Sequence, residues 1–234
     1  MSSIGEISTG RKIWEMVNPF VFMIVCMIIC TMAATSVIMT VSLMQGSMLT
    51  DISELSVKAS LISEMIFYAA VIVIKYRSIG YDKYRYGHSS KNWPILKCVA
   101  AAAAAFGISI VLNYLIAVSG IDNLFPTYEN SATALFSGQS PVILIITVVI
   151  LGPIAEEIIF RWMIFGRIRC YYGSKWAILF SSLLFGIYHM NVVQFIFCTL
   201  LGIVFAYLYD KSGNIFITIA AHMAVNMVGV LGFI

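Results

Sequence analysis

Long apolar stretches follow one another along almost the whole chain, and they constrain its fold more than any other feature. A charge-poor apolar stretch of roughly 18 or more residues is typical of a transmembrane helix. We count seven such spans, and the second is unusual because it contains Lys58 and Glu64. The spans lie at about 19–44, 57–76, 94–118, 141–166, 175–190, 192–209 and 214–233.

The composition agrees with this count. Hydrophobic residues make up 61% of the 234 residues and charged residues only 11%, whereas about a quarter of the residues of a soluble domain are charged. We therefore predict an all-α fold, a polytopic transmembrane helix bundle of seven or eight helices. No basic patch is interleaved with aromatic residues, which argues against nucleic-acid binding.

The distribution of charge predicts how the chain is oriented. The loop at 77–93 contains four basic residues, Arg77, Lys83, Arg85 and Lys91. The loops at 45–56 and 119–140 contain no Lys or Arg, and their charged residues are Asp51, Glu54, Asp122 and Glu129. Because Lys and Arg collect on the cytoplasmic side of a membrane, we predict a multi-pass protein of the cell membrane with a cytoplasmic N-terminus.

The fourth span carries the adjacent carboxylates Glu156 and Glu157, followed by Arg161. A charged residue at the centre of a membrane helix costs roughly 2.5–3.5 kcal/mol, so it needs a partner inside the bundle. Glu157 and Arg161 are four residues apart with the acid first, which is the spacing of helical ion pairs. We predict that Arg161 keeps Glu157 ionised and that Glu156 is free for chemistry. Pro153 has no N–H to donate, so the helix should kink or open one turn before the carboxylates.

Two later spans add histidines. His189 lies near the end of the fifth span, and the seventh contains His222 and Asn226. At a rise of about 1.5 Å per residue, these groups and the two glutamates fall in one band near mid-membrane. A carboxylate and an imidazole can deprotonate a water, and imidazole and carboxamide N–H groups can stabilise an oxyanion. These groups would suffice for peptide-bond hydrolysis, and no Ser or Cys stands at a recognisable nucleophile signature.

A metal-dependent reaction is an alternative. Two histidines and a glutamate can hold zinc and leave one position open. The ligands would be Glu156, His189 and His222. The HExxH motif is absent, so we expect no cofactor and keep zinc as the alternative.

The segment at about 141–230 resembles the CAAX protease and bacteriocin-processing family, also called the Abi family of intramembrane endopeptidases. The motifs of that family are EExxxR, FxxxH and HxxxN. They stand here in the same order and on separate predicted helices, as Glu156-Glu157 with Arg161, Phe185 with His189, and His222 with Asn226. The family's characterised fold has eight helices, one more than the spans counted above.

The resemblance implies a catalytic core at 141–234, preceded by membrane helices and loops at 1–140. It also implies a peptide or a membrane-associated protein as the substrate, cleaved within the lipid bilayer. The implied roles are water activation for Glu156 and His189, oxyanion stabilisation for His222 and Asn226, and support for Glu157 and Arg161.

Two functions of other classes stay open on the sequence alone. A bacteriocin-immunity protein or membrane scaffold without enzymatic activity would keep the polar cluster for packing. Ion or proton transport through the glutamates and histidines is the other alternative. The first three spans contain nothing that resembles the later cluster, which argues against the internal repeats of many transporters.

Overall fold

The computed structural model describes residues 8–45, 49–86, 89–121, 125 and 140–231. Within these residues the regular secondary structure is entirely helical. The N-terminal part forms α1 (Thr9–Gln45), α2 (Leu49–Tyr86) and α3 (Ile95–Ser119), and the C-terminal part ends with α8 (Ser174–Tyr188), α9 (Val192–Ser212) and α10 (Ile215–Leu231). Between them lies one long helix that changes its hydrogen-bond register along its length. Its successive segments are α5 (Pro141–Leu144), the π-helical η1 (Ile145–Leu151), α6 (Gly152–Glu157), the π-helical η2 (Ile158–Phe165) and α7 (Gly166–Tyr172).

The predicted all-α membrane bundle is confirmed, because a helix stands at each of the seven predicted spans. Four helices of the described part are long and apolar enough to cross a membrane: Thr9–Met44, Ile95–Ser119, Pro141–Tyr172 and Val192–Ser212. The helices α8 and α10 are shorter but also apolar. The predicted opening of the fourth span is confirmed as well, since the π-helical η1 ends at Leu151, about one turn before Glu156.

Two predicted boundaries are wrong. The second predicted span is 57–76, but α2 covers Leu49–Tyr86 and takes in much of both predicted loops. The first predicted span begins at 19, but α1 begins at Thr9 and has Pro19 inside it. Hydropathy marks where a segment stops being apolar, whereas a helix ends where its backbone hydrogen bonds end, and a polar sequence can continue a helix.

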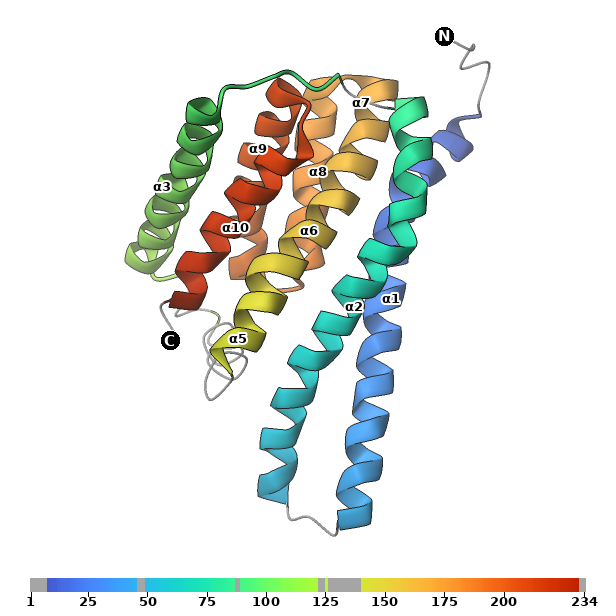
Figure 1. Ribbon diagram of the computed structural model, residues 1–234, viewed down its shortest axis with the longest axis vertical. Coiled ribbons are helices and arrows are strands. Elements are labelled where there is room, and N and C mark those ends of the chain that lie inside the picture. Colours follow the sequence, from blue (N-terminus) through green and yellow to red (C-terminus); the bar gives the residue numbers. More distant parts are fainter. Residues whose placement is uncertain (1–7, 46–48, 87–88, 122–124, 126–139, 232–234) are drawn as a thin grey trace.

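The helices form a bundle around the long fourth helix. Figure 1 shows α6, α8, α9 and α10 side by side at its centre, with α3 at one flank and the α1–α2 hairpin at the other. The far end of this hairpin extends beyond the rest of the bundle (Figure 1). The central helices therefore have neighbours on most sides, and α3 and the hairpin form the outer faces.

A polar cluster ties together the ends of three helices. Arg167 on α7 donates from Nε and Nη2 to the Asp82 carboxylate on α2, at 2.9 and 3.0 Å. Its Nη1 donates to the backbone carbonyl of Glu15 on α1, at 2.6 Å. These three helix ends therefore lie at the same end of the bundle. That this side is cytoplasmic stays a prediction, and the four acidic residues of the opposite loops lie outside the described side chains.

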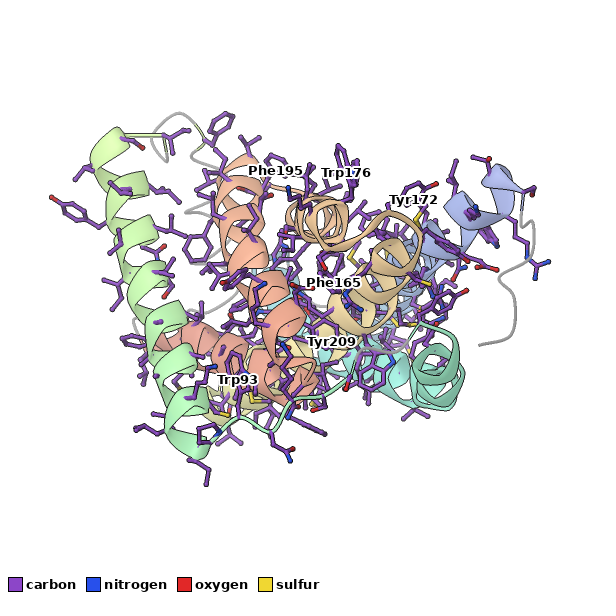
Figure 2. The ribbon with its side chains drawn as sticks, turned by 90° about the horizontal axis from the view of Figure 1, so that it is seen from above. Trp93, Phe165, Tyr172, Trp176, Phe195 and Tyr209 are labelled. Atoms are coloured by element: carbon purple, nitrogen blue, oxygen red, sulfur yellow. The ribbon has the colours of Figure 1, made fainter. Side chains whose placement is uncertain are left out.

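Aromatic side chains mark both the interior and the rim of the bundle. Seen from above in Figure 2, Phe165 and Tyr209 lie inside, where their rings meet edge to face at 5.4 Å. Trp176 and Tyr172 lie at the outer edge (Figure 2), and about half of each side chain is exposed. Such exposed aromatic rings near helix ends suit the membrane–water interface.

The helices α8 and α9 pack closely at a glycine that lets their two backbones approach. A Cβ placed on Gly186 would stand 2.7 Å from the carbonyl oxygen of Phe195 and 2.1 Å from Thr199 Oγ1. Membrane helices are held by such close packing rather than by the hydrophobic effect. The position of α8, which carries His189, therefore depends on Gly186.

We predict that Gly186→Ala destabilises the bundle by about 1–3 kcal/mol, because the added methyl group overpacks a contact that includes backbone. Gly107→Ala is the matched control: it is also in a helix, and a Cβ placed there would have nothing within 4 Å. Thermal unfolding of the purified proteins in one detergent measures both. Equal unfolding temperatures for the two variants would contradict the packing described here.

Candidate active site

The long fourth helix places a fully buried ion pair in the centre of the bundle. Arg161 Nη1 lies 3.2 Å from Glu157 Oε1, and neither side chain is exposed. The Arg161 guanidinium also lies over the ring of Phe185, 4.5 Å from its centroid. Its Nη2 donates to the carbonyl of Gly202 on α9, at 3.2 Å. The predicted pair between these two residues is thus present, and it joins the fourth helix to α8 and α9.

The imidazole of His222 on α10 lies between the two glutamates. Its Nδ1 is 3.0 Å from Glu157 Oε1, and its Nε2 is 3.6 Å from Glu156 Oε2. A carboxylate beside an arginine only accepts hydrogen bonds, so Nδ1 carries the proton in this contact. The ring of Phe205 stacks on the imidazole with 4.8 Å between centroids. Glu157 and Phe205 together fix the ring with Nε2 turned toward Glu156.

Glu156 has a second partner that the sequence motifs do not include. Tyr68 on α2 donates its hydroxyl to Glu156 Oε1 at 3.3 Å, and this hydroxyl also interacts with that of Tyr188. Gly152 permits the approach of the two helices, because a Cβ there would already lie 3.4 Å from the Tyr68 ring. Sequence reasoning missed Tyr68, and the available hint was the unusual charged residue Glu64 one turn before it.

His189 lies at the end of α8, across a phenylalanine ring from His222. The ring of Phe185 meets His189 edge to face at 5.0 Å and His222 at 5.6 Å. His189 Nδ1 is 2.9 Å from the carbonyl oxygen of Phe185, which can only accept, so Nδ1 is the donor and Nε2 of the neutral ring is left as an acceptor. His189 is also within range of Coulombic interaction with Glu156. Its free acceptor is what a general base requires.

Asn226 on α10 compensates for the proline of the fourth helix. In the π-helical register the Gly152 N–H donates to the carbonyl of Thr147, five residues earlier. The next donor in that register would be Pro153, which has no N–H for the carbonyl of Val148. Asn226 Nδ2 donates to this carbonyl at 2.9 Å. A carboxamide has two N–H donors, so one is still available to a ligand.

The six predicted residues therefore occupy one region of the bundle. Glu156, Glu157, Arg161 and His222 form a continuous chain of contacts. Asn226 is one turn beyond His222 on the same helix, and His189 lies across Phe185. The structure brings His222, rather than His189, into contact with Glu156. The individual roles stay a prediction.

For the described residues, the zinc alternative stays a prediction. Among them no three or more His, Cys, Asp and Glu side chains are grouped so that they could hold a metal ion. His222 directs Nδ1 to Glu157 and His189 directs Nδ1 to a backbone carbonyl, an arrangement that zinc-bound histidines also show. We derive no step through a metal.

Comparison with known proteins supports the resemblance drawn from the three motifs. Residues 138–228 match the family model described as "Type II CAAX prenyl endopeptidase Rce1-like". The chain is 39% identical over 98 residues to "Putative membrane peptidase YdiL" of Bacillus subtilis. This match covers 42% of the chain and only 40% of the length of that relative.

A second relative is matched over more of its length. The chain is 28% identical over 155 residues to "UPF0177 protein YxdF" of Lactococcus lactis subsp. lactis, which is 64% of this chain and 83% of that protein. No solved structure matches the chain. The resemblance to the CAAX protease and bacteriocin-processing family is thus confirmed for the C-terminal segment that carries the motifs, and the protein is a membrane protein.

We predict that Arg161→Leu destabilises the protein by about 3–5 kcal/mol, because it leaves the buried Glu157 carboxylate without its partner. Arg169→Leu is the control, since Arg169 pairs with Asp210 at 3.4 Å near the surface and is 32% exposed. The Arg169→Leu variant should lose less than about 1 kcal/mol of its free energy of unfolding. Unfolding of both variants in detergent measures the difference, and similar losses would argue against an ionised pair at 157 and 161.

Proposed function

We propose that this protein is an intramembrane endopeptidase that hydrolyses a peptide bond of a peptide or membrane-associated protein. One observation carries the proposal: the Glu156 carboxylate is held between the hydroxyl of Tyr68 and the imidazole of His222, inside an apolar bundle. A carboxylate held in this way, close to a second imidazole, is suited to proton abstraction from water.

The proposed reaction begins with a water between Glu156 and His189. Glu156, assisted by the free Nε2 of His189, takes a proton from this water as its oxygen attacks the carbonyl carbon of the substrate. The C–O bond that forms pushes the carbonyl electron pair onto oxygen. The resulting oxyanion accepts hydrogen bonds from the second N–H of Asn226 and from His222, which donates from Nε2 when both ring nitrogens carry a proton. When it collapses, the C–N bond breaks and the proton held by Glu156 passes to the leaving amine.

Glu157 and Arg161 act in this proposal through His222. The Glu157 carboxylate holds the Nδ1 proton of the imidazole and favours positive charge on the ring as the oxyanion forms. Arg161 supplies the opposite charge that this buried carboxylate requires. Neither residue needs to touch the substrate.

The similarity of residues 138–228 to a family described as prenyl endopeptidases supports peptide hydrolysis as the reaction. The name of the Bacillus subtilis relative points the same way. Neither match covers enough of the chain to carry over a substrate. Immunity or scaffold binding without catalysis is the alternative from a different class, and the activity of Glu156 variants separates the two.

We expect Glu156→Gln to abolish cleavage while the protein stays folded, because a carboxamide cannot accept the proton of water. Wild type, Glu156→Gln and Asp210→Asn are produced in one host, and new peptide N-termini in the membrane fraction are identified by mass spectrometry. Asp210 lies at the end of α9, bonded to Ser174 at 2.6 Å and outside the site. Termini that appear with wild type and Asp210→Asn should be missing with Glu156→Gln.

A synthetic peptide that contains such a cleavage site then quantifies the effect. The loss of general-base catalysis should lower kcat by about 10²–10⁴-fold. Identical termini with all three proteins would show that Glu156 does not do this chemistry. If no termini depend on the wild-type chain and Glu156→Gln retains the cellular phenotype, the function is binding rather than catalysis.

Tyr68 is predicted to position Glu156 without binding substrate. With the peptide identified above, Tyr68→Phe should lower kcat by about 3–10-fold and leave KM unchanged, since one hydrogen bond contributes about 0.5–1.5 kcal/mol. Tyr114→Phe on α3 is the control, because Tyr114 is 65% exposed and α3 lies at the flank of the bundle (Figure 1). A rise in KM at constant kcat would instead place Tyr68 against the substrate.

A further inference from the structure

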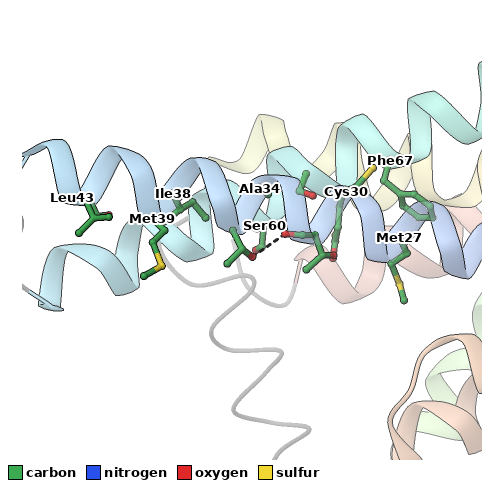
Figure 3. A pocket seen from close by; sticks show the side chains of 13 residues that line it. Met27, Cys30, Ala34, Ile38, Met39, Leu43, Ser60 and Phe67 are labelled. Carbon is green, nitrogen blue, oxygen red and sulfur yellow. Dashed lines mark hydrogen bonds between the residues drawn. The ribbon is translucent and has the colours of Figure 1, made fainter.

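A groove runs between the two helices of the N-terminal hairpin. Its volume is about 810 Å³, and its walls are a stripe of α1 and a short face of α2. Figure 3 shows the stripe from Leu43, through Ile38, Ala34 and Cys30, to Met27, with Phe67 of α2 beside that last end. From Met27 to Leu43 the helix rises roughly 24 Å, so the groove is long enough for an extended peptide segment of about seven residues.

Most of the groove is apolar, but one carboxylate lies on its wall. Glu64 shares a face of α2 with Ser60, Ser63 and Phe67, all of which line the groove. Its side chain is half-buried. The charged group with which it interacts among the described residues is Glu156, another carboxylate. Inside a membrane protein, a carboxylate that interacts with another carboxylate favours the approach of a cation or a hydrogen-bond donor.

Glu64 lies one helical turn from a residue that contacts the proposed active site. It precedes Tyr68 by four residues on α2, and Tyr68 donates to Glu156 at 3.3 Å. Four residues of helix rise about 6 Å, which equals about two residues of an extended peptide. Consider a substrate peptide that lies in the groove with its reacting bond at Glu156. The side chain about two residues from that bond would then lie next to Glu64.

We propose that this groove binds the apolar segment of the peptide substrate and that Glu64 selects a Lys or Arg about two residues from the bond that is cleaved. The inference rests on the proposed function for the position of that bond, whereas binding itself can be tested without cleavage. A cation from the substrate would neutralise Glu64 and reduce its repulsion of Glu156. The Met, Ile and Leu side chains on the walls of the groove would contact the apolar substrate residues on either side of that Lys or Arg.

Two labelled peptides test the charge preference. Each has about seven residues of Leu and Ala with one central Lys or Gln, a length too short for a stable helix, and is added to phosphatidylcholine vesicles that contain the protein. Energy transfer from a dye at the protein's N-terminus measures binding, with the membrane fraction of each peptide determined separately. The Lys peptide should bind at least about tenfold tighter than the Gln peptide, as expected for a desolvated charge pair.

The variants show whether Glu64 causes the preference. With Glu64→Gln the two peptides should bind alike, and Glu64→Asp should restore part of the difference. Asn113→Ala, on the exposed α3, should keep the full tenfold ratio. Equal binding of both peptides to the wild type, or a preference that survives in Glu64→Gln, overturns the inference and leaves the groove to a lipid chain.

The outcome is separable from that of the proposed function. Cleavage that depends on Glu156 but shows no preference for a basic residue would remove the role of Glu64 and leave the peptidase intact. A charge preference in binding without any cleavage would support the groove and remove the peptidase.

Discussion

The ion pair between Glu157 and Arg161 is the interaction on which the rest of the site depends. Both side chains are fully buried in a bundle of apolar helices, where either charge alone would cost several kcal/mol. The pair holds His222 through Nδ1, and His222 faces Glu156 through Nε2. Phe185 and Phe205 lie against the guanidinium, so two further helices are fixed by the same charge. The geometry around Glu156 therefore follows from a contact that itself does no chemistry.

A second constraint is the proline that precedes the carboxylates. Pro153 cannot supply the hydrogen bond that the carbonyl of Val148 requires, and in lipid no water replaces it. Asn226 satisfies this carbonyl, which fixes α10 against the opened part of the fourth helix. His222 lies one turn away on α10, so the same contact sets the depth of its imidazole relative to Glu156. The unusual backbone and the proposed oxyanion donors are thus parts of one arrangement.

The sequence predicted those features that depend on local spacing. Apolar runs located the seven helices, and the four-residue spacing of Glu157 and Arg161 predicted their pairing. The partners of Glu156 were not predictable in this way, because Tyr68 is 88 residues away and no pattern along the chain links it to the fourth helix. The full length of α2 was missed for a related reason: its polar ends continue the helix beyond the apolar run that hydropathy detects. The division of the chain at residue 141 stays a prediction.

The helix α2 contributes residues to the site that lie outside the segment similar to known proteins. The family match covers residues 138–228, which supply the glutamates, the arginine, the histidines and the asparagine. Tyr68 and Glu64 lie outside it, yet the first contacts Glu156 and the second lines the adjoining groove. Under the proposed function, the matched segment provides the chemistry, while the walls that would contact a substrate come largely from α1 and α2. Two proteins that share the matched segment can hydrolyse the same kind of bond and still select different peptides, because selection would depend on the hairpin.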